Sequence, residues 1–499
     1  MPFNRIWLPI AIAAWLAAHV AAADDSRANL LRRIDAASEK ATRYLIAAQS
    51  PDGAWRSETY GALRDGPSLT PFVISGLWFL PQAGPQGKTA FRKGADYLVG
   101  FADDKGQLRL GPRELLFPVY PAACASRMIV HAERSPRYLR AQQAWLAYLR
   151  GRQLNEALGW QPSDPEYGGW GFSLDVPRKP PPGRPKELLC ESNLAATIFA
   201  VAALRSAKTP DDDPAYRQAL GFVQRCQNYS DDAGDPRYDD GGFFFIPNDA
   251  AQNKAGVAGT DRHGRQRYHS YGTMTADGLR ALLRCGLSAD HPRVVAARKW
   301  LERNFSPKCN PGAFPADRAV LQDATYYYWT WASAHAFLAI GERGTTSAWP
   351  QALAEELLRR QQADGTWVNR YTDAKEDDPL IATSWAAASL AICRAMLAGE
   401  QAKPLDSCQL RPKITKAQAA KIAEGRLRRE SFANTIDAAK VTIRYANYGP
   451  SNAAALAWIV DFARIGSGDI GVPGLWSRGY QVVIDPDTGE VKEAFGYKR

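Results

Sequence analysis

Apolar and polar positions between residues 26 and 399 fall into two kinds of segment. The first kind is almost uncharged and rich in small and aromatic side chains, as helices covered on all sides must be. Six segments have this character: residues 70–80, 117–131, 193–204, 274–285, 326–340 and 381–396. We predict that these six segments are the inner helices of the fold.

The second kind of segment is amphipathic. Residues 29–49 place Leu30, Ile34, Ala37 and Ala41 on one helical face, with charges opposite. Residues 136–149, 292–304 and 349–360 repeat this pattern. We predict that these segments are outer, half-exposed helices that alternate with the inner ones.

Four short phrases follow helices and spell variants of Gln-x-x-Asp-Gly-x-Trp. In the two complete phrases, Asp52 and Asp364 precede a glycine, which takes positive φ readily and so suits a turn. The aromatic residue that ends each phrase is a large apolar wedge between neighbouring helix pairs. These wedges are Trp55, Trp170, Phe243 and Trp367.

Repetition of one helical hairpin predicts a mainly α architecture with six hairpins. They can close into an α/α toroid, with inner helices around an axis, or stack as an open solenoid. Closure is favoured because the first helix is outer and the last is inner, so these two can complete a pair. The fold class that we predict is a six-hairpin α/α toroid over residues 24–401.

Composition changes near residue 402. Residues 415–429 have a helical pattern, whereas residues 440–448, 455–465, 480–484 and 491–495 have the character of strands. We therefore predict a separate small α+β domain over residues 402–499.

Residues 1–23 have the pattern of a signal peptide: Arg5, an apolar stretch to Val20, then three alanines. This predicts an exported protein, periplasmic or secreted, with an uncleaved anchor as the alternative. No later stretch is apolar enough to predict a membrane span, so no integral segment is expected once the signal is removed.

Charge and cysteine content exclude several classes of protein. The 62 Lys+Arg and 52 Asp+Glu are interspersed without a basic stripe, so we predict no nucleic-acid partner. The 7 cysteines are odd in number and irregular in spacing, unlike a disulfide framework or a zinc ribbon. Buried free thiols, or one or two disulfide bridges, remain as alternatives. No Gly-rich phosphate loop or metal-spaced histidine pair is visible, so we predict no cofactor and no metal.

The four phrases and the alternating hairpins resemble the QW-repeat superfamily. Its members include squalene-hopene and oxidosqualene cyclases and the β subunits of protein prenyltransferases. Residues 269–279 and 323–329 are similar to inner-helix starts of secreted squalene-cyclase-like proteins of unassigned activity. Residues 480–491 resemble PepSY-type or cystatin-like modules. The resemblance implies the toroid over residues 26–399 but no particular activity, because one fold hosts many functions.

The chemistry of the two enzyme families is not retained in the matching passages. Protonating cyclases of the superfamily carry Asp-x-Asp-Asp-Thr-Ala, whereas residues 190–195 here read Cys-Glu-Ser-Asn-Leu-Ala. Prenyltransferases hold zinc with Asp-x-Cys and a histidine. Here Asp323 stands in place, but Thr325 occupies the cysteine position and residues 381–385 contain no histidine. Neither activity is therefore expected of this chain.

Aromatic and polar residues crowd two of the inner segments and form a candidate site. Tyr327, Tyr328 and Trp331 are candidate ligand-binding residues of one segment, and Tyr271 opens another. The candidate catalytic groups are Asp323, His335 and His269. These side chains either fill the toroid core or line a pocket for an isoprenoid or other apolar small molecule, or for a sugar. For Asp323, an N-cap of the helix that follows is an equal alternative.

Three functions remain open on the sequence, and whether the chain is an enzyme is undecided. The toroid could bind or transform a terpenoid-like ligand. The chain could be a non-catalytic interaction protein that contacts a protein partner through its C-terminal domain. The third function is a glycan-active α/α barrel with Asp239 and Asp240 as an acid/base pair, against which stands an ordinary turn before Gly241.

Overall fold

The computed structural model describes residues 7–80, 84–111, 115–187, 189–231, 234–340, 348–371, 373–400, 416–429, 436–448, 455–464, 478–485 and 489–498. The chain divides into two compact units. The first unit comprises Met1–Thr209 and Pro214–Cys408, and the second comprises Pro210–Asp213 and Gln409–Arg499.

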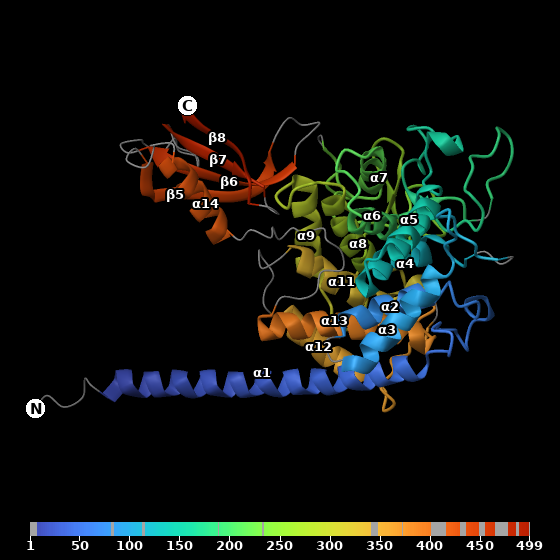
Figure 1. Cartoon of the computed structure of the whole chain (residues 1–499), viewed down its shortest axis with the longest axis horizontal. Helices are drawn as coiled ribbons and strands as arrows, with labels where there is room; N and C mark the ends of the chain where they lie inside the picture. Colours follow the sequence, from blue (N-terminus) through green and yellow to red (C-terminus); the bar gives the residue numbers. More distant parts are fainter. Residues whose placement is uncertain are drawn as a thin grey trace, which may run out of the picture. The chain divides into compact units, whose positions relative to one another are not determined.

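Six inner helices, which are labelled in Figure 1, form a closed ring by their contacts. They are α2 (Thr70–Phe79), α4 (Val119–Ala132), α6 (Leu194–Ser206), α8 (Gly272–Arg284), α11 (Tyr326–Ile340) and α13 (Pro379–Ala398). Each packs against the next in this order, and α13 packs against α2. The α/α toroid predicted from the sequence is confirmed, and the open solenoid is excluded.

Six outer helices surround this ring. They are α1 (Trp7–Ala47), α3 (Gly84–Val99), α5 (Pro136–Arg150), α7 (Pro214–Arg225), α9 (Pro292–Asn304) and α12 (Trp349–Arg360). Both α1 and α12 pack against α13, so the first outer helix and the last inner helix meet as predicted. Helix α1 is uninterrupted from Trp7 and so begins before residue 29, where we predicted its start (Figure 1). Its alanine-rich first half has high helix propensity, which accounts for the extension.

The inner helices form the core. Among the described residues, α13 is the helix long and apolar enough to cross a membrane, and 72% of its apolar window is buried within the protein. Helices α1, α2, α11 and α12 all contact it. Burial in the toroid therefore accounts for its apolar character. Cys124, Cys190, Cys226 and Cys393 are buried free thiols, and Cys309 is a partly exposed free thiol. Cys285 is partly exposed, and Cys408 lies outside the described residues.

The first repeated phrase links three helices through its glutamine and tryptophan. Gln49 Nε2 donates to the carbonyl oxygens of Gly53 and Ala90, both at 2.9 Å. The Trp55 backbone N–H donates to Thr70 Oγ1 at 2.9 Å, and its indole N–H donates to the Leu45 carbonyl at 2.7 Å. The phrase thus connects the end of α1 to the start of α2 and to α3.

The bonds of the glutamine side chain and of the aromatic residue's backbone N–H recur at the other three phrases. The glutamines are Gln153, Gln227 and Gln361, each bonded to its own turn and to an adjacent outer helix. The aromatic residues Trp170, Phe243 and Trp367 donate their backbone N–H to Thr197, Thr275 and Thr383. Gln153 and Gln227 stand far from their glycines in sequence, so the sequence pattern alone did not reveal them.

Glycine is required where each phrase turns toward the neighbouring outer helix. Gly53 has φ +92°, and a Cβ atom there would lie 2.4 Å from the Lys93 carbonyl oxygen of α3. Gly365 has φ +93° and approaches the backbone of Lys40 in the same way. Both the positive φ and the close backbone approach exclude other residues.

Shorter elements lie in the loops between the helices. They are η1 (Gly61–Leu63), η3 (Glu156–Leu158), β1 (Trp170–Gly171), β2 (Ser192–Asn193), β3 (Val257–Thr260), β4 (Gln266–Tyr268), η4 (Ala316–Arg318) and α10 (Val320–Asp323). Strand β1 pairs with β2, and β3 pairs with β4, both antiparallel.

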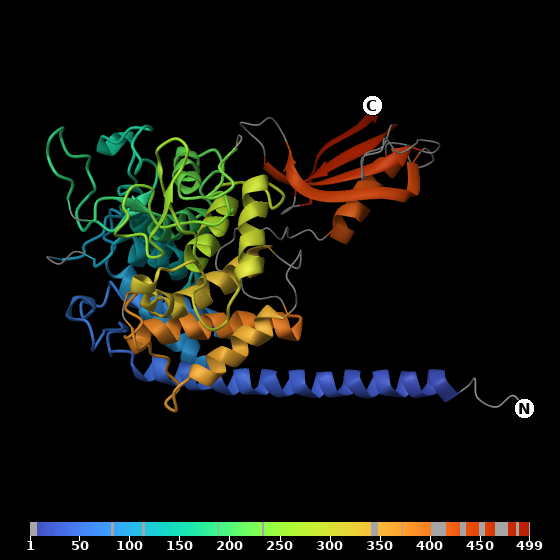
Figure 2. The same cartoon turned by 180° about the vertical axis from the view of Figure 1, so that it is seen from behind.

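The second unit is a four-stranded antiparallel sheet with one helix against it (Figure 2). Its elements are α14 (Lys416–Arg429), β5 (Ile436–Tyr448), β6 (Ala455–Arg464), β7 (Arg478–Ile484) and β8 (Val491–Lys498), with the strands paired in sequence order. Ala419, Ala423 and Leu427 of α14 share a core with Trp458 and Val482. The small α+β character predicted for this region is confirmed.

Candidate functional site

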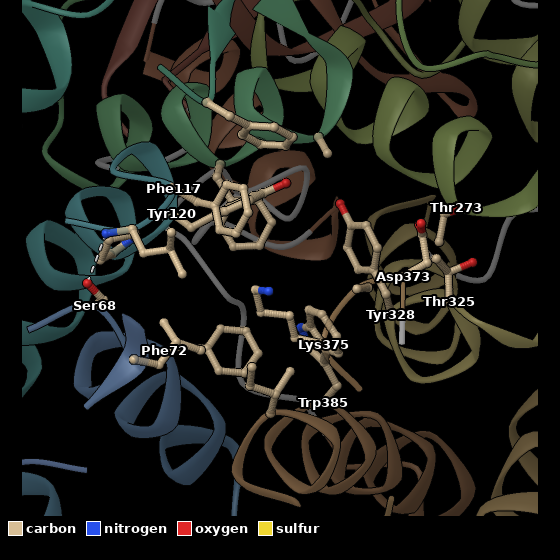
Figure 3. Close-up of a pocket in the computed structure, with 18 of the residues that line it drawn as sticks. Ser68, Phe72, Phe117, Tyr120, Thr273, Thr325, Tyr328, Asp373, Lys375 and Trp385 are labelled. Carbon is tan, nitrogen blue, oxygen red and sulfur yellow. Dashed lines mark hydrogen bonds between the residues drawn. The ribbon is translucent and has the colours of Figure 1, made fainter. Parts of the chain in front are cut away.

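A cavity of about 220 Å³ lies at the end of the toroid where the inner helices begin (Figure 3). Residues from the first two turns of every inner helix line it. One from each helix, in ring order, is Phe72, Tyr120, Phe199, Thr273, Tyr328 and Trp385. The cavity therefore depends on the whole ring rather than on one hairpin.

Aromatic contacts fix the walls of the cavity. The ring of Trp385 stacks on Tyr328 with centroids 5.2 Å apart and meets Phe72 edge-on at 5.1 Å. Across the cavity, Tyr120 meets Phe199 edge-on at 4.8 Å. Such pairs hold one another in defined orientations. The walls are consequently apolar and preformed.

The loop that precedes α13 borders the cavity with charged residues. Asp373 forms an ion pair with Lys254 of the facing loop. Asp377 Oδ1 accepts a hydrogen bond from the Tyr60 hydroxyl at 2.5 Å. Asp378 accepts from the Ser57 hydroxyl and, at 2.8 Å, from the backbone N–H of Leu380, so it caps α13. The bonds to Tyr60 and Ser57 attach the loop to the η1 region.

Glu376 attaches the same loop to α11. Its buried carboxyl accepts the backbone N–H groups of Tyr327 at 2.9 Å and Tyr328 at 2.8 Å, and the side-chain amide of Asn369 at 2.7 Å. Burial raises the pKa of Glu376 to about 8, while the three N–H donors oppose that rise. The carboxyl satisfies backbone donors that the first turn of a helix leaves unpaired.

Lys375 lies between these anchored acids and extends into the cavity (Figure 3). Its φ of +58° is unusual for a residue with a side chain. Its Nζ lies 4.2 Å from the ring centroid of Tyr60 and 5.7 Å from that of Phe117. The lysine ammonium is therefore placed against aromatic faces at the cavity.

A buried carboxyl lies behind the cavity wall. Asp277 of α8 accepts hydrogen bonds from the Tyr328 hydroxyl and from Arg280 Nη1, the latter at 3.0 Å. Burial raises the pKa of Asp277 to about 6, and the charge of Arg280 opposes this rise. The Tyr328 side chain thus borders the cavity, while its hydroxyl group donates a hydrogen bond to Asp277.

The candidate residues of α11 separate into two groups. Tyr328 lines the cavity. Trp331 stacks on Phe199 at 5.3 Å, and His335 meets Trp331 edge-on at 4.8 Å. Burial lowers the pKa of His335 well below its usual value, so the imidazole is neutral at pH 7. Its Nε2 has no hydrogen-bond partner in the part of the chain that the structure describes.

The other candidate residues lie at loops and helix ends. The Tyr327 ring packs edge-on against Tyr326 at 5.1 Å. Tyr271 is buried at the start of α8, and its backbone N–H donates to the Phe243 carbonyl at 3.1 Å. The His269 backbone N–H donates to Gly256 at 3.1 Å, and burial lowers the pKa of the imidazole. Asp323 ends α10, and its carbonyl accepts from Asn369 at 2.6 Å.

The described lining of the cavity includes none of the three candidate catalytic groups, Asp323, His335 and His269. Asp323 is the last residue of α10 rather than an N-cap of α11. The wedge residues Trp55, Trp170, Phe243 and Trp367 are fully buried between helices, as their structural role requires.

The two acids considered for glycan cleavage have structural partners. Asp240 accepts the Gly242 N–H at 2.9 Å, the Ser270 hydroxyl at 2.7 Å and the Trp300 indole N–H at 3.0 Å. Asp239 forms an ion pair with Arg267 at 2.8 Å. Among the described residues, no group of three or more His, Cys, Asp or Glu side chains is placed to hold a metal ion.

Three residues near the cavity were missed by the sequence analysis: Lys375, Glu376 and Asp277. For Asp277 a signal was present, because it is the lone carboxylate of the inner segment 274–285, beside Arg280 and Arg284. Lys375 and Glu376 belong to a charged run, residues 373–378, whose composition is that of an ordinary surface turn.

No protein-family model and no curated protein matches this chain. Among solved structures, it is similar to a variant of the type II terpene cyclase MstE from Scytonema in complex with merosterolic acid A, with 15% identity, coverage of 74% of this chain and 99% of that chain, and a TM-score of 0.48. A protein from Actinoplanes has 17% identity, coverage of 72% and 99%, and a TM-score of 0.43. A glucoamylase from Hypocrea jecorina has 11% identity, coverage of 95% and 88%, and a TM-score of 0.27. This chain is thus structurally similar to a type II terpene cyclase at low sequence identity.

Proposed function

We propose that the toroid binds an apolar, isoprenoid-like small molecule in the cavity where its inner helices begin. The observation that carries this proposal is the preformed wall to which all six inner helices contribute, five of them with an aromatic residue. A cavity of about 220 Å³ is smaller than the ~300–1,000 Å³ typical of pockets for drug-sized ligands, so the ligand is short. The resemblance of the repeated phrases to isoprenoid enzymes favours the same ligand class.

Binding is favoured over cyclisation by the groups at the cavity. Protonation of an alkene needs a neutral carboxylic acid within reach of the ligand. The carboxyl among the described lining residues is that of Asp373, which is exposed and paired with Lys254. Asp277 lies behind Tyr328. The ammonium of Lys375 would also repel a carbocation in this space.

The other two hypotheses have less support. The partners of Asp239 and Asp240 favour the turn interpretation over glycan cleavage. Contact with a protein partner through the second unit, and export directed by residues 1–23, remain proposals of the sequence.

Native mass spectrometry with organic extraction tests the proposed function. We expect the protein, incubated with farnesol, to retain a ligand-sized adduct. A Leu116→Trp variant, which fills the cavity from its lining, should lose the adduct. The matched control is Leu139→Trp on the exposed face of α5, where the leucine is 43% exposed. Equal retention by both variants would show that the cavity does not bind the ligand.

A further inference from the structure

The cavity contains hydrogen-bond donors that lack acceptors. The Trp385 side chain lines the cavity and is only 8% exposed, yet its indole N–H has no hydrogen-bond partner in the part of the chain that is described. A buried donor without an acceptor costs about 1–3 kcal/mol. An acceptor on a bound ligand would remove that cost.

Lys375 is a second donor at the same cavity, and the acids around it are already bonded elsewhere. Asp373 forms an ion pair with Lys254. Asp377 accepts a hydrogen bond from the Tyr60 hydroxyl. Asp378 accepts hydrogen bonds from the Ser57 hydroxyl and the Leu380 backbone N–H. Glu376 accepts three N–H groups at the start of α11. No carboxylate of the described residues forms an ion pair with Lys375, whose Nζ instead faces Tyr60 and Phe117.

The inner helices add to this electrostatic preference. All six begin at the cavity, and the N-terminal end of a helix carries a partial positive charge that favours anions. Glu376 already uses the start of α11 in this way. The cavity is therefore apolar along its walls and favours negative charge beside Lys375.

We infer that the ligand is an amphiphile with one carboxylate, which accepts hydrogen bonds from Lys375 Nζ and the Trp385 indole N–H while its apolar tail contacts the aromatic walls. This inference rests on the proposed function and specifies the ligand class. In the view of Figure 3, Lys375 and Trp385 lie below Phe117 and Tyr120.

A carboxylate fits these donors better than a diphosphate. A carboxylate has two oxygens and a single charge, which match one ammonium and one indole N–H. The second lysine of the lining, Lys254, is already neutralised by Asp373. A diphosphate would bring further negative charge next to Asp373 and Glu376. The described lining has no further unpaired cation to neutralise that charge.

Calorimetric titration with three probes that share one tail tests the inference: farnesol, farnesoic acid and farnesyl diphosphate. At pH 7.5 we expect the acid to bind about 10- to 100-fold more tightly than the alcohol, the range of a charge-assisted hydrogen bond. In Lys375→Met this preference should disappear, so that the acid and the alcohol bind with about equal affinity. Lys375→Arg should retain most of it, and Trp385→Phe should reduce it by about 3- to 10-fold.

The control variant is Lys179→Met, a lysine that pairs with Asp164 and does not line the cavity. It should leave the preference for the acid unchanged, and thermal unfolding checks that every variant folds. Equal binding of acid and alcohol to the wild type would overturn the inference and leave the proposed function intact. Preference for the diphosphate would overturn it in favour of a phosphate ligand. Failure of all three probes would overturn both proposals.

Discussion

The toroid axis has two regions that the same helices build differently. Where the inner helices begin, their aromatic residues surround a cavity and present donors to it. About one turn and two turns further along α11, Trp331 and His335 fill the axis, with Arg280 4.6 Å above the Trp331 ring and Phe79 5.1 Å from His335. Tyr328 and Trp331 are thus three residues apart but differ in role. A shift of one helical turn separates contact with a ligand from core packing.

The substitution Trp331→Ala should have the largest effect among the tests of this comparison. Trp331 is 5% exposed and packed on all sides, so its removal should lower the free energy of unfolding by about 3–5 kcal/mol. Phe72→Ala, in the half-buried wall of the cavity, should cost only about 1 kcal/mol, because that ring already borders empty space. Urea unfolding followed by circular dichroism measures both. Equal losses would mean that the two regions are packed alike.

The pH dependence of stability tests the buried carboxyl between the two regions. The pKa of Asp277 is raised from 3.8 to about 6, so between these values the native state binds more protons than the unfolded state. Stability from this group is therefore present at low pH and lost as pH rises through about 6. Relative to Asp277→Asn, the wild type should lose about 3 kcal/mol between about pH 4 and pH 7. A difference that does not change with pH would show that Asp277 titrates normally.

Gly53→Ala tests the repeated phrases, whose turns connect the helices that build both regions. The added Cβ would collide with the Lys93 carbonyl oxygen at 2.4 Å, and the positive φ adds strain. We expect a loss of about 2 kcal/mol in the free energy of unfolding. Gly106→Ala is the matched control, since Gly106 has φ +73° but no atom within 4 Å of the new Cβ. The free energy of unfolding of this control should fall by about 1 kcal/mol. If it fell as much as in Gly53→Ala, the positive φ alone, and not the collision, would explain the destabilisation.

His335→Phe should have the smallest effect, and in the opposite direction. Its neutral imidazole has a buried Nε2 without a partner among the described residues, between Phe79 and Trp331. Replacing it with a ring of similar size removes the unpaired polar atom. The free energy of unfolding should therefore increase by about 1 kcal/mol, which is measured as a rise in the melting temperature. A clear loss of stability would indicate that His335 has a hydrogen-bond partner in solution.

The sequence predicted the ring better than the cavity for a physical reason. Inner helices such as α6, whose one charged residue is Arg205 in its last turn, are almost uncharged because they are covered on every side, and that requirement is local to each segment. Which aromatic residue faces the cavity depends on the ring as a whole, so Tyr328 and Trp331 looked equivalent in sequence. Lys375 was missed because its loop is positioned by bonds from Glu376 to α11, far away in sequence. Asp277 could have been noticed as the single acid of an inner segment.

Closure of the ring also constrains how the chain can fold. Asp35 of α1 forms an ion pair with Arg394 of α13 across a separation of 359 residues. At a synthesis rate of about 5–20 residues per second, α1 exists for about 20–70 s before its partner helix is made. During that time the apolar face of α1 has no α13 to cover it. Contacts of such long separation make folding slow, so the helix synthesised first is among the last to reach its native contacts.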